Sequence, residues 1–132
     1  MRIIGLDYGD KRIGVAVSDL LEIIASGVTA VANLAELKKV IDNYTDVKEI
    51  VVGLPKKLDG SLGIQAEKTN AFIEELKKIV NYKIVTWDER LTTSQAERGM
   101  IAAGLSRAKR KKVIDQSAAA IILQSYLDCR KK

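Results

Sequence analysis

Apolar and polar residues alternate along the first third of the chain in a pattern that predicts β-strands. Residues 2–8 form a β-rich run, residues 9–11 have the composition of a turn, and residues 12–18 alternate strictly. Residues 23–31 predict a third strand, so the three strands should form an antiparallel meander. One face of the second strand has only small side chains, which predicts that a helix packs close against Gly14, Ala16 and Ser18.

The period changes to that of a helix after residue 33. Apolar residues recur at helical spacing over 34–44, with Asn33 as the candidate N-cap. Residues 48–53 contain a continuous apolar run, typical of a parallel strand that is buried on both faces. The rest of the chain predicts, in order, a loop over 54–63, a helix over 64–80, a strand over 82–87, a helix over 91–103, a loop over 104–112 and a helix over 113–130.

This order of elements predicts an α/β fold in a single domain that covers residues 1–132. Strands joined through helices follow right-handed crossovers, so the first, fourth and fifth strands should be parallel and adjacent. The carboxyl ends of parallel strands lie along one edge of the sheet, where ligands tend to bind. Asp7, the segment 53–55 and the pair Asp88-Glu89 follow these three strands, so they should meet at that edge.

The composition excludes several kinds of catalytic site. The chain of 132 residues has no His and one Cys, Cys129, so it can hold neither a histidine-based catalytic triad nor a Cys-rich metal site. A lone Cys fits a reducing compartment, and we expect a cytoplasmic protein. The longest uncharged apolar stretch, residues 117–127, is far shorter than the ~20 residues that span a bilayer, so no membrane partner is expected.

Positive charge is concentrated in the second half of the chain. Residues 1–66 carry 8 basic and 9 acidic side chains, whereas residues 67–132 carry 14 and 8. Such clustering indicates a polyanionic partner such as nucleic acid, although a basic run can also be a solvated loop. The candidate residues for contacts with phosphates are Lys56, Lys57, Arg107, Lys109, Arg110, Lys111 and Lys112.

Four acidic residues are candidates for catalysis. Asp7 interrupts an apolar strand, where a carboxylate is energetically costly unless it is solvated, hydrogen-bonded or bound to a metal. Its position therefore suggests a functional role, although Asp7 could instead cap the turn that follows. Asp88 and Glu89 are adjacent, so on an extended chain their side chains point to opposite faces. We therefore expect only one of them to enter the site, and their spacing does not show which one. Asp115 lies near the start of the last helix, where an acid can simply complement the helix dipole, but it shares the helix side that packs inward.

Carboxylates that meet in a chain without histidine suit a divalent metal. Hard oxygen ligands bind Mg²⁺ or Mn²⁺, and these ions bridge phosphate oxygens. Two such ions offset the repulsion between the carboxylates, activate water and stabilise the leaving oxygen of a phosphodiester. Together with the basic residues, this chemistry predicts a metal-dependent hydrolase that cleaves structured nucleic acid.

Five segments together resemble the YqgF/RuvX family. They occur in the family's order and cover almost the whole chain, at residues 7–19, 52–55, 59–61, 88–93 and 115–127. The resemblance implies the RNase H-like fold, with a mixed five-stranded sheet of order 3-2-1-4-5 flanked by helices. It also implies a nuclease that matures the 5′ end of pre-16S rRNA in ribosome biogenesis or, by analogy with RuvC, a Holliday junction resolvase.

The resemblance also implies which residues act, and it favours Glu89 over Asp88. The acids that hold the metals and catalyse would be Asp7, Glu89 and Asp115. The cations near the scissile strand would be Lys11 and Arg12. RuvC-type sites use four acidic residues, for which Asp88 and Asp19 are further candidates.

Three other functions fit the same sequence. A junction resolvase cuts symmetric strands and would be a homodimer, whereas a processing nuclease could be a monomer. An actin- or hexokinase-type nucleotide-binding domain has a similar first loop, but it needs two lobes and 132 residues provide one. A non-catalytic RNA-binding scaffold would keep the fold and use its carboxylates only structurally.

Overall fold

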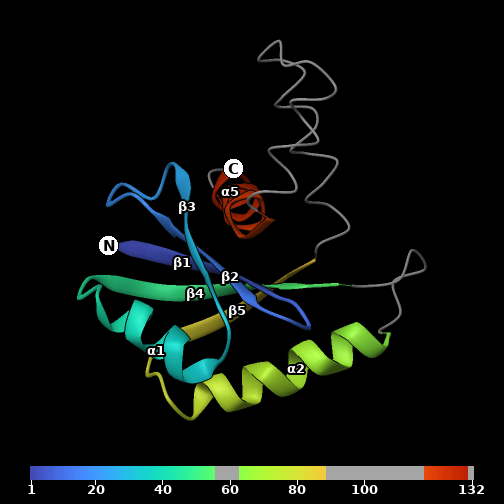
Figure 1. The fold of residues 1–132 in the computed structure, drawn as a ribbon. Helices are drawn as coiled ribbons and strands as arrows, with labels where there is room; N and C mark the ends of the chain where they lie inside the picture. The colour runs from blue at the N-terminus through green and yellow to red at the C-terminus, as the bar shows by residue number, and fades with distance from the viewer. Residues whose placement is uncertain (56–62, 89–117, 131–132) are drawn as a thin grey trace.

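The computed structural model describes residues 1–55, 63–88 and 118–130 (Figure 1). Five strands are assigned in this part of the chain: β1 (Arg2–Tyr8), β2 (Ile13–Ser18), β3 (Ala25–Val31), β4 (Val47–Leu54) and β5 (Lys83–Asp88). The described helices are α1 (Leu34–Asp42), α2 (Ile64–Lys77) and α5 (Ala118–Arg130). The predicted helix over 91–103, the loop over 104–112 and the first residues of the last predicted helix lie outside the described residues.

The sheet has the predicted order and strand directions. Its five strands lie in the order β3-β2-β1-β4-β5. β1 pairs antiparallel with β2, and β2 pairs antiparallel with β3, so the N-terminal meander is confirmed. β1, β4 and β5 are parallel neighbours, as the rule of right-handed crossovers requires.

The ends of several strands differ from the prediction because hydrogen bonds of the turns replace those of the sheet. The Gly9 N–H donates to the Arg12 carbonyl at 3.0 Å, so the turn includes Arg12 and β2 begins at Ile13. The N–H groups of Ile23 and Ile24 donate to the Asp19 carboxylate at 2.7 and 3.0 Å, which delays the start of β3.

Two helices show the expected start and end signals. Asn33 caps α1, because its side chain accepts from the Glu36 N–H at 2.9 Å, while the Glu36 carboxylate accepts from the Ala32 N–H at 2.7 Å. α2 ends earlier than predicted, at Lys77, because the next N–H groups fold back to bond in a tightened turn, with those of residues 79 and 80 sharing the Leu76 carbonyl.

Helices cover both faces of the sheet (Figure 1), with α5 on one face and α1 and α2 on the other. Each face therefore has its own apolar core. The larger core joins β1, β2 and β4 to α1 and α2, and it contains Ile4, Leu6, Ile50, Leu37 and Phe72 among its buried residues. The smaller core lies under α5 and is built from Ile3, Ala16, Val51, Ala119, Ile122, Leu123 and Leu127.

Small residues allow α5 to lie close to the sheet, as predicted for the second strand. A Cβ added at Gly5 of β1 would lie 2.7 Å from the Leu123 Cβ, and one added at Gly14 of β2 would lie 3.5 Å from the Ala119 Cβ. Ala16 is fully buried in the same core. Ser18 ends the small face, where its hydroxyl accepts from the Ile3 N–H at 2.8 Å.

β3 and β5 are the edge strands of the sheet, so each is paired on one side only. None of the helices in the described ranges is long and apolar enough to cross a membrane.

Candidate active site

Asp7 lies on the central strand β1, on the face covered by α5. It is half-buried and pairs across the ladder with Gly14 of β2. A Cβ on Gly14 would lie 3.7 Å from the Asp7 Cβ, so the glycine leaves open space beside the carboxylate. The prediction that Asp7 stands near the carboxyl end of its strand is confirmed.

A groove of about 1050 Å³ opens beside Asp7. Three parts of the structure line it: the β1–β2 hairpin, the middle of β3 and the first described turn of α5. The residues of the last two parts are small or uncharged, namely Gly27, Val28, Thr29, Ala30, Ala118 and Ala119. On the sides of β3 and α5, the described lining therefore brings no charged side chain to the groove.

Asp88 lies on the other face of the sheet. It ends β5 and is in register with Leu54 of β4. Side chains alternate along a strand, so Asp88 shares its face with Ile84, which packs against the core under α1 and α2. The neighbouring Trp87 points to the face of Asp7, where its indole N–H donates to the Ser125 hydroxyl at 3.1 Å. Trp87 thus packs against the smaller core.

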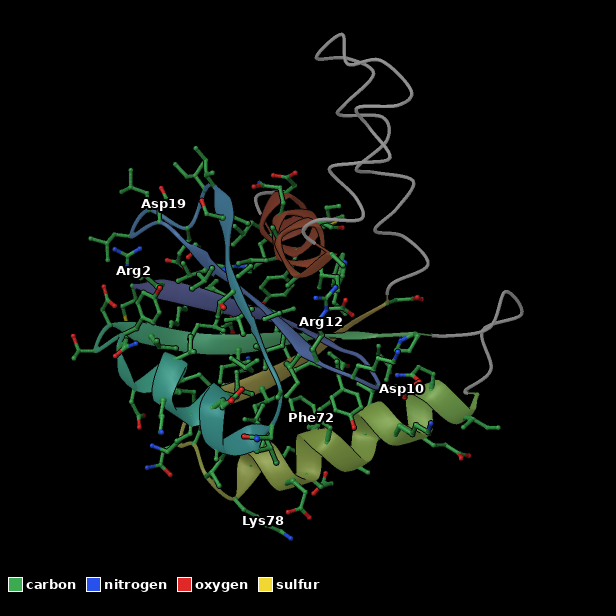
Figure 2. The ribbon with its side chains drawn as sticks, viewed as in Figure 1. Arg2, Asp10, Arg12, Asp19, Phe72 and Lys78 are labelled. Carbon is green, nitrogen blue, oxygen red and sulfur yellow. The ribbon has the colours of Figure 1, made fainter. Side chains whose placement is uncertain are left out.

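The hairpin between β1 and β2 brings two cations to the groove. Lys11 and Arg12 are exposed and line it together with Asp7 (Figure 2 labels Arg12). Neither forms an ion pair within the described part of the chain, whereas the adjacent Asp10 pairs with Lys68 of α2 at 3.4 Å. Within the described residues, two positive charges beside Asp7 therefore have no acidic partner.

The suggestion that Asp19 is a fourth acid of the site is wrong. It follows the far end of β2, about 16 Å along the strand from Gly14, which faces Asp7. Its carboxylate accepts the N–H groups of Ile24 and Ile23, and these hydrogen bonds hold the pKa of Asp19 below its usual value. Asp19 thus organises the β2–β3 turn.

A polar cluster anchors the C-terminal end of α5 to the sheet, and sequence reasoning did not find it. The Tyr126 hydroxyl donates to the buried Glu49 carboxylate of β4 at 2.8 Å, and Arg130 pairs with the same carboxylate at 3.6 Å. Burial and the bond to Glu49 raise the pKa of Tyr126 to about 12. Arg130 also pairs with Glu22 at 3.2 Å. An acid inside the apolar run of β4 was the signal that could have indicated a buried partner.

Gln124 makes a second anchor, on the side of the edge strand β3. Its side-chain oxygen accepts from the Ala25 N–H at 2.9 Å, and its side-chain nitrogen donates to the Ile23 carbonyl at 3.0 Å. The helix therefore has a defined position over the groove. No sequence pattern signals this role, because Gln124 is an ordinary polar residue on a helix.

Several predicted residues lie outside the part of the chain that the structure describes. They are Glu89 and Asp115, and the cations Lys56, Lys57, Arg107, Lys109, Arg110, Lys111 and Lys112. Within the described ranges, no three His, Cys, Asp or Glu side chains form a metal-binding group. Asp7 supplies one hard oxygen ligand in an open groove, which fits one ligand of a magnesium or manganese site.

Known proteins similar to this chain are described as nucleases or resolvases. The family model described as "RuvX: Holliday junction resolvase" matches residues 1–129. A protein of Halothermothrix orenii named "Putative pre-16S rRNA nuclease" is 52% identical, over 100% of this chain and 98% of its own length. A protein of the same name from Caldanaerobacter subterraneus subsp. tengcongensis is 50% identical, over 99% of each chain.

A solved structure shares the fold at low identity. It is the RuvC of T. thermophilus in complex with a Holliday junction substrate, which superposes with a TM-score of 0.57 at 15% identity. The alignment covers 99% of this chain and 96% of that one, which supports the RNase H-like architecture seen in the sheet. With the family match over nearly the whole sequence, the chain belongs to the RuvX family, also called YqgF, a family of nucleic-acid hydrolases.

Proposed function

We propose that this protein is a divalent-metal-dependent nuclease, a single domain over residues 1–132, that hydrolyses phosphodiester bonds of structured RNA during 5′-end processing of pre-16S rRNA. The observation that carries the proposal is the half-buried Asp7, in an open groove beside Lys11 and Arg12, two cations with no acidic partner among the described residues. The names of relatives about 50% identical support pre-16S rRNA as the substrate. Such an enzyme would work in the cytoplasm.

Asp7, Glu89 and Asp115 would hold Mg²⁺ or Mn²⁺. Glu89 directly follows Asp88, the last residue of β5, and Asp88 lies on the face of the sheet opposite to Asp7. Asp115 precedes Ala118, a residue that lines the groove, by three positions in the sequence. These relations support the same three acids that the family resemblance implies.

The residues of the chain divide the work of hydrolysis. The bound metal would activate water and stabilise the leaving oxygen of the phosphodiester. Lys11 and Arg12 would attract the phosphates on either side of the cut, because neither is neutralised by an acid in the described structure. Lys56, Lys57 and the basic run 107–112 would add contacts to the backbone farther from Asp7.

The change of Asp7 to Asn tests the metal site. We expect Asp7→Asn to slow cleavage of a pre-16S rRNA leader in Mg²⁺ or Mn²⁺ on the order of 10²-fold or more, because a metal ion contributes several kcal/mol to such reactions. The measurement is the single-turnover cleavage rate on a gel. Asp42→Asn is the matched control, since Asp42 is exposed on α1 and pairs with Lys38 away from the groove.

Two results would contradict the proposal. Cleavage by Asp7→Asn at the wild-type rate would remove Asp7 from the metal site. Binding of the leader without cleavage by any form of the protein, the triple variant of Asp7, Glu89 and Asp115 included, would favour the RNA-binding scaffold. The match to RuvX over residues 1–129 already favours a nuclease over an actin-type nucleotide-binding domain.

A Holliday junction resolvase is the second candidate, because the matching family model carries that description. A resolvase needs two sites on symmetric strands and hence a homodimer. Symmetric cleavage of a four-way DNA junction by a dimer, with the leader RNA left intact, would favour this function over RNA processing.

A further inference from the structure

A second cavity lies across the β1–β2 hairpin from Asp7, and we call it the aromatic pocket. Its volume is about 390 Å³, within the range of pockets that hold small molecules. It opens between the hairpin, the start of α1 and the middle of α2, and its lining includes Tyr8, Leu34, Lys68, Ala71 and Phe72. The nuclease site as proposed above does not use this space.

The floor of the aromatic pocket is a fixed aromatic surface. The rings of Tyr8 and Phe72 stack with centroids 4.5 Å apart and an interplanar angle of 22°. Phe72 is buried in the core of that face, and Tyr8 remains half-exposed. Because the stack with Phe72 restricts the Tyr8 ring, little side-chain freedom is lost when a planar ligand stacks on this pair.

The charges around the aromatic pocket favour an anionic ligand. Both acids of its lining are paired, Asp10 with Lys68 at 3.4 Å and Glu75 with Lys78 at 3.2 Å. Lys11, also in the lining, forms no ion pair in the described residues. The combination of an aromatic floor and a cation that has no acidic partner among the described residues suits a nucleotide, which has a planar base and a charged phosphate.

The aromatic pocket and the groove beside Asp7 share one wall. Gly9, Asp10 and Lys11 of the hairpin line both cavities (Figure 2 labels Asp10 at the hairpin and Phe72 below it). Asp7 and Tyr8 are consecutive on β1, so their side chains point to opposite faces of the sheet. A strand that crosses the hairpin can therefore present a phosphate to Asp7 and a neighbouring base to Tyr8.

We propose that the aromatic pocket binds one unpaired nucleobase of the strand whose phosphate lies at Asp7. The inference rests on the proposed nuclease function and deepens it, because it requires an unpaired nucleotide next to the cleaved bond. A base within a duplex reaches such a pocket only by leaving its stack, at an energetic cost. The preferred substrate is therefore a single-stranded or extrahelical segment, with little preference among bases, since every base has a stacking face.

Fluorescence of 2-aminopurine tests this proposal without relying on cleavage. The full chain is titrated, with Ca²⁺ in place of Mg²⁺, into short single-stranded RNA and DNA oligonucleotides that carry one 2-aminopurine at successive positions. Stacking on an aromatic ring quenches this base. We expect quenching at one position of a single strand and none when the same strand is fully paired.

Two neighbouring residues of α2 give a matched pair of variants. Ala71 is exposed and lines the aromatic pocket, whereas Asn70 is exposed and does not line it. Ala71→Leu fills the pocket from the surface, so we expect loss of quenching and binding on the order of 10-fold weaker, the scale of one lost base–aromatic stack. Asn70→Leu should bind and quench as the wild type does. Tyr8→Leu removes the ring itself and should behave like Ala71→Leu, with melting curves to establish that each variant folds.

The results separate this proposal from the nuclease proposal. Equal affinity and equal quenching in the wild type, Ala71→Leu and Asn70→Leu would overturn the aromatic pocket, even if Asp7→Asn abolishes cleavage. The opposite result is that Ala71→Leu removes the quenching while Asp7→Asn still cleaves. This result would support the pocket and overturn the metal site.

Discussion

Gly5 and Gly14 lie on adjacent strands under α5, but only Gly14 has room for a methyl group. At Gly5 a Cβ would meet the Leu123 side chain at 2.7 Å and the Ala119 carbonyl at 3.2 Å. At Gly14 the nearest atom would be the Ala119 Cβ, at the ordinary distance of 3.5 Å. The contact of α5 with the central strand therefore depends on one missing side chain.

We expect Gly5→Ala to lower the free energy of unfolding by about 1–3 kcal/mol, the usual cost of overpacking a core. The added methyl group must push α5 away from β1 or force Leu123 into a poorer rotamer. Urea unfolding followed by circular dichroism measures the effect. Gly14→Ala is the control and should change stability far less; an equal loss in both variants would show that the close approach at Gly5 is not the cause.

Individual residues also show where sequence reasoning stops. The alternation along a strand predicts that Asp88 and Glu89 point to opposite faces, but not which face Asp7 occupies. The pairing of β4 with β5 supplies that missing fact, because it places Asp88 in register with Leu54 and away from Asp7. The pattern and the register together therefore place Asp88 away from Asp7, while Glu89 lies outside the described residues.

Among the elements, α5 depends most on contacts between distant parts of the sequence. Its bonds to β3 through Gln124 and to β4 through Tyr126 join residues 99 and 77 positions apart. The sequence predicts the helix and its apolar face, because these follow from local spacing. It does not predict the anchors, because a buried polar pair is recognised only when the fold brings both partners together.

The raised pKa of Tyr126 makes the α5 anchor sensitive to alkaline pH. The pKa of Tyr126 is about 12 in the folded state, whereas the ordinary value for a tyrosine is 10.0. The hydroxyl therefore adds stability that is complete below pH 10 and is lost as the pH rises from 10 towards 12. We expect the wild type to be more stable than Tyr126→Phe at pH 9, and this difference to shrink by pH 12. Urea midpoints at each pH measure it, and a difference that stays constant would contradict the role of the hydroxyl.

For the molecule as a whole, the order and direction of the strands could be predicted from sequence. Period-two runs separated by helical runs leave few topologies, and the crossover rule makes β1, β4 and β5 parallel. The site could be predicted only in part. The topology places Asp7 and the end of β5 at the same edge of the sheet. The position of Asp115 depends on how α5 docks, which no local pattern encodes.

The sheet also distributes stability unevenly between the parts of the site. Asp7 stands on a strand that is hydrogen-bonded on both sides, whereas the proposed ligand Glu89 directly follows the edge strand β5 in the sequence. Edge elements open locally at lower free-energy cost than central ones. We expect cleavage activity to be lost on heating a few degrees below the midpoint of global unfolding, as measured by rates and circular dichroism on the same sample. Coincident transitions would contradict this expectation.

The central place of β1 has a consequence for how the protein is made. The strand that carries Asp7 is synthesised before β2 and β4, and it can pair with β2 through the hairpin as soon as that strand has emerged. Its other side must wait until β4 has emerged, and its α5 face is covered only after residue 118 has been translated. On the ribosome, β1 therefore stays half-paired until β4 has been made, and the groove beside Asp7 is completed only when the start of α5 has followed.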